Sequence, residues 1–199
     1  PHELIDTGDG SLPLGQSTIH DHKQLGSIHF EDILAKSSNI AMVQLVQALQ
    51  PGKLLMEYER FGLFSPLFSQ VPGEVTGKHG INPSQLEEAV MSYGYGLSST
   101  VMGIAKAYNI IANEGLDPGV NIVLNTHRVT PEVVMSKHVA RQITDMMVRV
   151  TEHGLSSRSA AIKGLRVAGK SGTTHLLDKQ GAYHNQYVAS FAGFAPADD

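Results

Sequence analysis

The stretch Val167-Ala168-Gly169-Lys170-Ser171-Gly172-Thr173-Thr174 decides the fold that this sequence predicts. It has the composition of a strand whose middle carries a cation, two hydroxyl groups and a glycine. Successive side chains of a strand point to opposite faces, so Ser171 and Thr173 share one face, while Lys170 points to the other or along the strand edge. Gly172 has no side chain, which lets a ligand or another backbone approach closely. Such an edge can hold a carboxylate with two hydroxyls and offer a backbone N–H to a developing oxyanion.

A second polar cluster, Ser37-Ser38-Asn39, lies between two apolar segments, Ile28 to Ala35 and Ile40 to Leu49. In such a connection a hydroxyl can relay a proton, and a carboxamide can hold a peptide-like group. Taken alone, this cluster is equally typical of a helix cap. Ser-x-Asn followed by Lys-Ser/Thr-Gly, however, makes up the second and third of the three signatures of penicillin-binding proteins and serine β-lactamases. The combination favours a catalytic interpretation.

With Tyr93-Gly94-Tyr95-Gly96-Leu97 between the two clusters, the sequence resembles the transpeptidase domain of class B penicillin-binding proteins, the division-type enzymes in particular. Gly73-Glu74, Ala160 to Gly164 and Ala192 to Pro196 extend the resemblance, which runs from about Asp6 to Pro196. It implies an α/β fold of the α+β kind, as in penicillin-binding transpeptidases and serine β-lactamases. That fold has a five-stranded antiparallel sheet with helices on both faces. This chain would be mostly helical and end in a β-hairpin that supplies two of the strands.

The resemblance also implies a role for each motif residue in acyl transfer from a D-Ala-D-Ala stem peptide, or in binding a β-lactam. Ser37 would relay a proton toward the leaving amine, and Asn39 would hold the side amide of the substrate. Lys170 would set the electrostatics around Ser37. The hydroxyls of Ser171 and Thr173 would bind the terminal carboxylate, and the Thr173 N–H would form half of the oxyanion hole.

Two further residues, Gly172 and Tyr95, are expected to line the substrate cleft, although a tyrosine in a Gly-Tyr-Gly turn can equally be a packing anchor. No cofactor is expected. By the resemblance, the parent enzyme would lie at the periplasmic face of the bacterial inner membrane and would have division proteins as partners.

The first family signature, Ser-x-x-Lys, which supplies the nucleophile, does not occur in this sequence. Ser17-Thr18-Ile19-His20 and Ser136-Lys137-His138-Val139 both end in the wrong residue. An acyl-enzyme needs a nucleophile, so the expectation is an inactive fragment of a longer enzyme. A non-catalytic scaffold or binding module that kept the fold is the alternative.

Two other enzyme classes share parts of the pattern. A class A β-lactamase needs a Glu-x-x-x-Asn-type loop to activate water, and Glu74 with Val75 to Lys78 does not reproduce it. A long-lived acyl form is therefore expected. A carboxypeptidase is possible, but the Tyr-Gly-Tyr-Gly and Ala-Gly-Phe-Ala-Pro stretches resemble division transpeptidases better.

Composition excludes several other classes of protein. The 199 residues carry 15 Lys+Arg against 19 Asp+Glu, scattered along the chain, which argues against nucleic-acid binding. No apolar run approaches the length of a membrane span. There is no cysteine, which excludes thiol catalysis and disulfides. His20, His22 and His29 cluster near the N-terminus but lack the companion ligands of a zinc site, so exposed loop histidines and no metal are expected.

Periodicity divides the partial domain, residues 1–199, into an extended arm over 1–27, a helical part over 28–153 and a hairpin over 166–196. Asn82-Pro83 reads as the start of one helix. Thr100 to Asn113 is expected to bury Val101, Ile104, Ala105, Tyr108 and Ile111. Ser136 to His153 is expected to bury Val139, Ile143, Met147 and Val150. Because a lone two-stranded hairpin is marginal, the fragment is expected to rely on the helical part, on a partner or on self-association.

Overall fold

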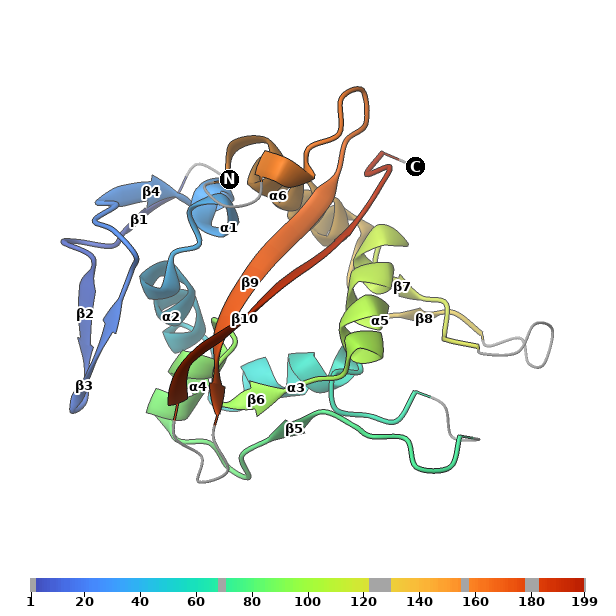
Figure 1. Ribbon diagram of the computed structural model, residues 1–199, viewed down its shortest axis with the longest axis horizontal. Coiled ribbons are helices and arrows are strands. Elements are labelled where there is room, and N and C mark those ends of the chain that lie inside the picture. The colour runs from blue at the N-terminus through green and yellow to red at the C-terminus, as the bar shows by residue number, and fades with distance from the viewer. Residues whose placement is uncertain (1–2, 68–70, 122–129, 155–157, 178–182, 199) are drawn as a thin grey trace.

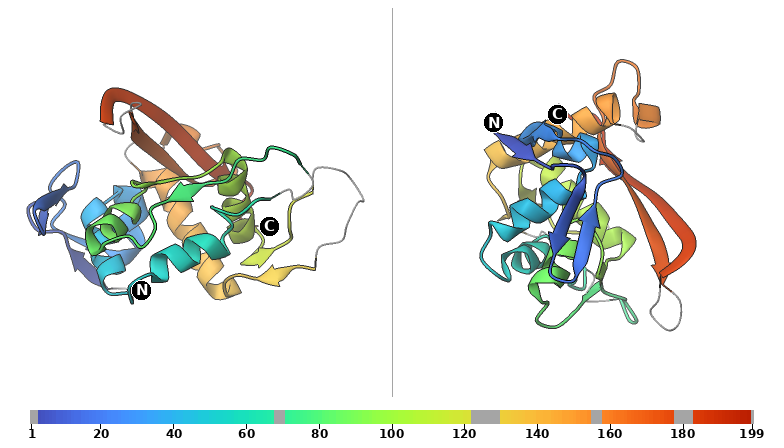
Figure 2. Two further views of the ribbon diagram at one scale, coloured as in Figure 1. Left: turned by 90° about the horizontal axis from the view of Figure 1, so that it is seen from below. Right: turned by 90° about the vertical axis from the view of Figure 1, so that its left-hand side faces the viewer.

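The structure is a computed structural model, and it describes residues 3–67, 71–121, 130–154, 158–177 and 183–198 (Figure 1). Residues 178–182, in the middle of the hairpin expected over 166–196, lie outside this range. A body of helices carries one long β-hairpin on one side, and short strand pairs lie around the rest (Figure 2). None of the described helices combines the length and the apolar composition that crossing a membrane requires.

The N-terminal arm consists of two short antiparallel strand pairs. β1 (Leu4–Asp6) pairs with β4 (Ser27–His29), and β2 (Ser11–Leu14) pairs with β3 (Ser17–His20). Thr7 Oγ1 donates a hydrogen bond of 2.8 Å to Gly26 O, which closes the arm on itself. The arm is therefore ordered structure, and β3 ends beside the Ser-Ser-Asn cluster, where His20 O accepts a hydrogen bond from Asn39 Nδ2.

Within the described part of the chain, six helices and two 3-10 turns form the body. They are η1 (Phe30–Asp32), α1 (Ile33–Lys36), α2 (Asn39–Gln47), α3 (Lys53–Arg60), α4 (Gln85–Met91), α5 (Val101–Ala112), α6 (Lys137–His153) and η2 (Arg158–Ala160). Two short antiparallel pairs connect them: β5 (Lys78–His79) with β6 (Leu97–Ser98), and β7 (Leu116–Asp117) with β8 (Glu132–Val133).

The start of α4 differs from the expectation. The cap is Ser84 rather than Asn82, and Ser84 forms a capping box with Glu87. A serine followed three residues later by glutamate satisfies two N–H groups at once. This reciprocal cap outweighs the preference for proline at the first helical position, and Asn82 adopts a positive φ of 50° in the turn before it.

Helix α6 holds the hairpin against the body. Its Met147 and Val148 pack on Ala168, at the start of β9 (Ala168–Leu177). Thr151 Oγ1 also donates a 2.7 Å hydrogen bond to Val167 O. The expectation that Val139 is buried is wrong, since 41% of it is exposed.

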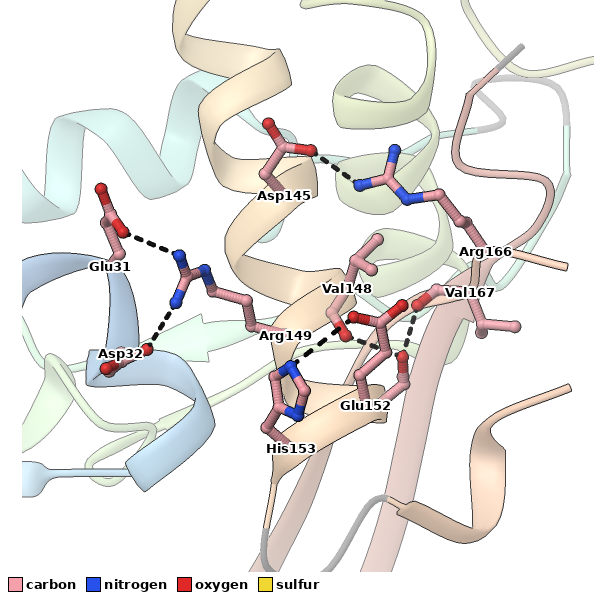
Figure 3. A network of polar contacts seen from close by, with 10 residues as sticks. Glu31, Asp32, Asp145, Val148, Arg149, Glu152, His153, Arg166 and Val167 are labelled. Atoms are coloured by element: carbon pink, nitrogen blue, oxygen red, sulfur yellow. Dashed lines mark hydrogen bonds and ion pairs between the residues drawn. The ribbon is translucent and has the colours of Figure 1, made fainter. Parts of the chain in front are cut away.

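Two polar contacts on the flank of α6 tie other segments to the helix. Arg149 donates to Glu31 at 2.9 Å and to Asp32 at 3.0 Å, which fixes the turn before α1 to α6 (Figure 3). Arg166, just before β9, pairs with Asp145 at 2.9 Å. The segments that lead into both sequence motifs are thus anchored to the same helix.

Strand β9 pairs antiparallel with β10 (Tyr183–Phe194), with Phe191 opposite Ser171 and Ala192 opposite Lys170. The hairpin predicted from the sequence is confirmed. In Figure 1 it runs between α2 on one side and α5 on the other. Among the described residues, no third strand pairs with either of its edges.

The predicted inward face of α5 is wrong for Val101, Ile104 and Ala105, which are exposed, whereas Tyr108 and Ile111 pack partly buried against the core. Val101 is 83% exposed and Ile104 is 39% exposed, while Gly103 and Ile110 are buried. Val101, Ile104 and Tyr108 instead line an open cavity of about 650 Å³ between α5 and the hairpin. Periodicity located the apolar face of the helix, but nothing within the described residues covers that face fully.

Candidate active site

The two sequence motifs meet in space. Lys170 Nζ donates a hydrogen bond of 2.8 Å to Ser37 Oγ. The same ammonium donates a hydrogen bond of 2.9 Å to Ser171 O. The lysine side chain therefore follows its own strand before it reaches Ser37. A cation and a hydroxyl at this distance can exchange or share a proton, which is what an acyl-transfer site requires of them.

Ser37 is held in an unusual backbone conformation at the junction of α1 and α2. Its φ of 52° and ψ of 46° are left-handed, and it forms the C-terminal cap of α1. The Ser37 N–H donates to Leu34 O at 3.2 Å, and the Ser38 N–H donates to Ile33 O at 3.3 Å. Left-handed backbone is costly for a residue with a side chain and persists where the surroundings enforce it. Here it turns the Ser37 hydroxyl toward β9.

Ser38 and Asn39 connect the junction to the next helix and to the N-terminal arm. Ser38 is the N-cap of α2, and its Oγ accepts from the Ala41 N–H at 3.0 Å. Asn39 Nδ2 donates to His20 O at 2.9 Å. Ser38 therefore supplies the helix cap, while the flanking Ser37 and Asn39 line the cleft.

A cavity of about 230 Å³ is lined by all of the predicted site residues. Its walls are formed by His22, Lys23, Leu25, Lys36, Ser37, Asn39, Tyr93, Tyr95, Lys170, Ser171, Gly172 and Thr173. Every residue that the sequence singled out for substrate or catalysis is in this set. The structure thus brings together positions that lie far apart along the chain.

The electrostatic character of this cavity is cationic. Three lysines and a histidine line it, and none of the described Asp or Glu residues does. Burial lowers the pKa of the Lys170 ammonium from its ordinary value, because the partly enclosed site disfavours the charged form. A cavity with hydroxyls and cations but no carboxylate suits a ligand that carries an acid.

The aromatic wall comes from the Tyr-Gly-Tyr-Gly turn after α4. The rings of Tyr93 and Tyr95 meet edge to face, with centroids 5.7 Å apart. Gly94 and Gly96 have φ values of 99° and 72°, which side chains rarely adopt, and they give the turn its shape. Nearby, Tyr58 OH donates 2.8 Å to Met91 O at the end of α4, and this bond holds α3 against the start of the turn.

Sequence reasoning missed several residues around this site: Lys23, Leu25 and Lys36 of the cavity wall, and Asp21 beside it. Asp21, directly after β3, accepts from Ser38 Oγ at 2.7 Å and from the Ile40 N–H at 3.1 Å. It carries no local signal, because its partners lie seventeen and nineteen residues away. The neighbouring His20 contacts Ser11 Oγ at 3.2 Å through Nδ1, and the described residues contain no group of three or more potential metal ligands.

Comparison with known proteins agrees with this geometry. Residues 1–199 match the penicillin binding protein transpeptidase domain. Peptidoglycan D,D-transpeptidase FtsI of Buchnera aphidicola (subsp. Baizongia pistaciae) is 30% identical over the whole chain, which spans 36% of that protein. FtsI of Escherichia coli K12 is 33% identical over 90% of the chain and 31% of its own length.

Solved structures give the same result. The apo transpeptidase domain of penicillin-binding protein 3 from Burkholderia pseudomallei superposes with a TM-score of 0.90 at 34% identity, over 98% of this chain and 60% of that one. A peptidoglycan glycosyltransferase structure from Burkholderia ambifaria gives 0.87 at 33% identity, over 98% and 61%. The chain spans about a third of the curated relatives and belongs to the penicillin-binding protein transpeptidase domain family.

Proposed function

We propose that the protein is a serine-type peptidoglycan D,D-transpeptidase and that these residues form the walls of its active site. The observation that carries the proposal is the contact of Lys170 with Ser37 inside a cavity that Asn39 and the Ser171–Thr173 strand also line. The names of the FtsI relatives support the same reaction. We place the enzyme in septal cell-wall synthesis, at the periplasmic face of the inner membrane, on the strength of the division-type resemblance.

The reaction is acyl transfer in two steps. A serine hydroxyl, which we place outside these 199 residues, attacks the carbonyl between the two D-alanines of a stem peptide. The peptide C–N bond breaks, and the terminal D-alanine leaves as an amine that takes up a proton. A neighbouring stem-peptide amine then attacks the ester, forms the cross-link and returns a proton to the serine.

The residues of this chain act on the substrate and on protons. Ser37, which accepts a hydrogen bond from Lys170, passes the proton to the leaving amine. Asn39 holds the side amide of the substrate. Strand β9 presents Ser171 and Thr173 to the terminal carboxylate, and the Thr173 N–H stabilises the oxyanion; losing one such donor costs about 3–4 kcal/mol of barrier.

β-Lactams enter this proposal as substrate mimics, with their ring amide in place of the D-Ala-D-Ala bond and their carboxylate on the same hydroxyls. Since Glu74 hydrogen-bonds the Leu67 N–H and does not line the cavity, no carboxylate of the cavity wall would activate water for deacylation. The acyl form should therefore be long-lived.

The direct test is release of D-alanine by the complete gene product. We would supply a D-Ala-D-Ala pentapeptide and an amine acceptor, and quantify D-alanine together with the cross-linked peptide. We expect both in equal amounts, and both abolished by penicillin. D-Alanine without the cross-linked product would indicate a carboxypeptidase, and no release at all would favour a non-catalytic scaffold of the same fold.

A further inference from the structure

Asp21 connects the N-terminal arm to the Ser-Ser-Asn junction. Both carboxylate oxygens are used: Oδ2 accepts from Ser38 Oγ at 2.7 Å, and Oδ1 accepts from the Ile40 N–H at 3.1 Å. The backbone next to it takes part as well, since His20 O accepts from Asn39 Nδ2 at 2.9 Å. Three consecutive residues of the junction are therefore held by two consecutive residues of the arm.

The two residues that donate to Asp21, Ser38 and Ile40, are buried, which makes the carboxylate hard to replace. Ser38 is only 1% exposed, and its hydroxyl already accepts from Ala41. Without Asp21, the buried Ser38 O–H and Ile40 N–H would lose their acceptor. A buried donor left without a partner costs about 1–3 kcal/mol.

The arm can hold the junction because apolar packing of β3 fixes the position of Asp21. Ile19, two residues before Asp21, is buried in one cluster with Ile40 and Val43 of α2 and with Ala89 of α4. The position of Asp21 is therefore set by apolar packing beneath α2. In addition, its negative charge lies at the N-terminus of α2, where the helix dipole favours an anion.

We propose that Asp21 is a positioning residue of the active site, acting through Ser38 to hold Ser37 and Asn39 at their working distances. The inference rests on the proposed transpeptidase function. Ser37 occupies a left-handed conformation that it would not adopt unaided. Asp21 holds both Ser38 and the Ile40 N–H at the start of α2. These contacts keep the Ser37 hydroxyl 2.8 Å from Lys170 Nζ.

The test compares two isosteric variants in the complete gene product. Asp21→Asn keeps the shape of the side chain and one acceptor but removes the charge and the acceptor for Ser38. Asp9→Asn is the matched control, because Asp9 lies on the same arm and binds the Ser11 N–H at 3.0 Å without touching the junction. For both variants we would determine the acylation rate constant and the binding constant for penicillin separately, together with the melting temperature.

We expect Asp21→Asn to lower the acylation rate constant about 10- to 100-fold, since a displacement of about 1 Å can cost 10²-fold. Penicillin binding should change little, and Asp9→Asn should behave as the wild type. A purely structural role would lower the melting temperature and leave the rate constant of the folded protein unchanged, which would overturn the proposal.

Hydrogen exchange separates this inference from the proposed function. Backbone amides of residues 38–41 should exchange faster in Asp21→Asn than in Asp9→Asn, whether or not the protein reacts with penicillin. If the wild type is not acylated, the proposed function fails, and exchange still decides the role of Asp21. Equal exchange in the two variants would show that Asp21 does not hold the junction.

Discussion

Lys170 and Ser37 are joined by a hydrogen bond of 2.8 Å although 133 residues separate them in the chain. One residue lies on β9 and the other at the end of α1, and both elements are tied to α6. Arg149 holds the turn before α1, while Met147 and Thr151 hold the start of β9. Helix α6 therefore sets the separation of the two walls of the cleft.

Replacing Lys170 by methionine should show how much the partly buried ammonium destabilises the folded protein, separately from its role in acylation. Burial lowers the pKa of Lys170; its charged form is thus disfavoured in the folded state. This penalty is present below the folded-state pKa and disappears as pH rises toward the unfolded value. The free energy of unfolding of the wild type, relative to Lys170→Met, should therefore increase from neutral to alkaline pH. Urea titrations at several pH values would detect this.

Lys163→Met is the control for that experiment, because the Lys163 side chain is exposed and lies outside the cavity. Its stability difference from the wild type should not vary with pH in this range. If Lys170→Met gave the same flat profile, the partial burial of the ammonium would have no energetic consequence. Acylation by the complete gene product should be strongly reduced in Lys170→Met alone.

Tyr58 should make the protein sensitive to strong alkali. Burial raises the pKa of Tyr58 to about 12. A raised pKa contributes stability that is complete below the unfolded value of 10 and is lost as pH rises toward 12. Tyr58→Phe removes this dependence. It should cost only about 0.5–1.5 kcal/mol at neutral pH, the usual value of one hydrogen bond, because Met91 O also accepts from the Gly94 N–H at 3.1 Å.

Denaturant titrations of the wild type and Tyr58→Phe at neutral pH and above pH 10 would check this prediction. The two stability curves should converge as pH increases. Parallel curves would mean that Tyr58 ionises as easily in the folded protein as in the unfolded chain.

The cationic lining of the cavity should make acylation by an anionic β-lactam depend on salt. Lys23 and Lys36 lie in the cavity wall with Lys170. Salt screens the attraction between these lysines and an approaching anion, with a screening length of about 10 Å at 0.1 M. The acylation rate at limiting drug concentration should fall as salt is added. The double variant Lys23→Gln/Lys36→Gln should make the acylation rate less dependent on salt. Lys78→Gln, which lies outside the cavity, should leave the salt dependence unchanged. A salt-independent wild type would contradict the electrostatic account.

The parts of the site that lie in short contiguous motifs were predicted from the sequence. The residues from Lys170 to Thr173 form the expected strand, and the Ser-Ser-Asn cluster lies where two helices meet. Asp21 could not be found this way, because its role arises from packing of the arm under α2. The apolar face of α5 was recognised from its period, but periodicity does not state what covers a face, and Val101 is largely exposed.

The position at which penicillin attaches tests the proposed active site most directly. We would incubate the 199-residue chain and the complete gene product with penicillin, record intact masses and map the modified peptide. The account predicts that only the complete gene product gains the mass of the drug, on a serine of a Ser-x-x-Lys segment outside these residues. An adduct on a serine within the 199 residues, or no adduct on either protein, would contradict it.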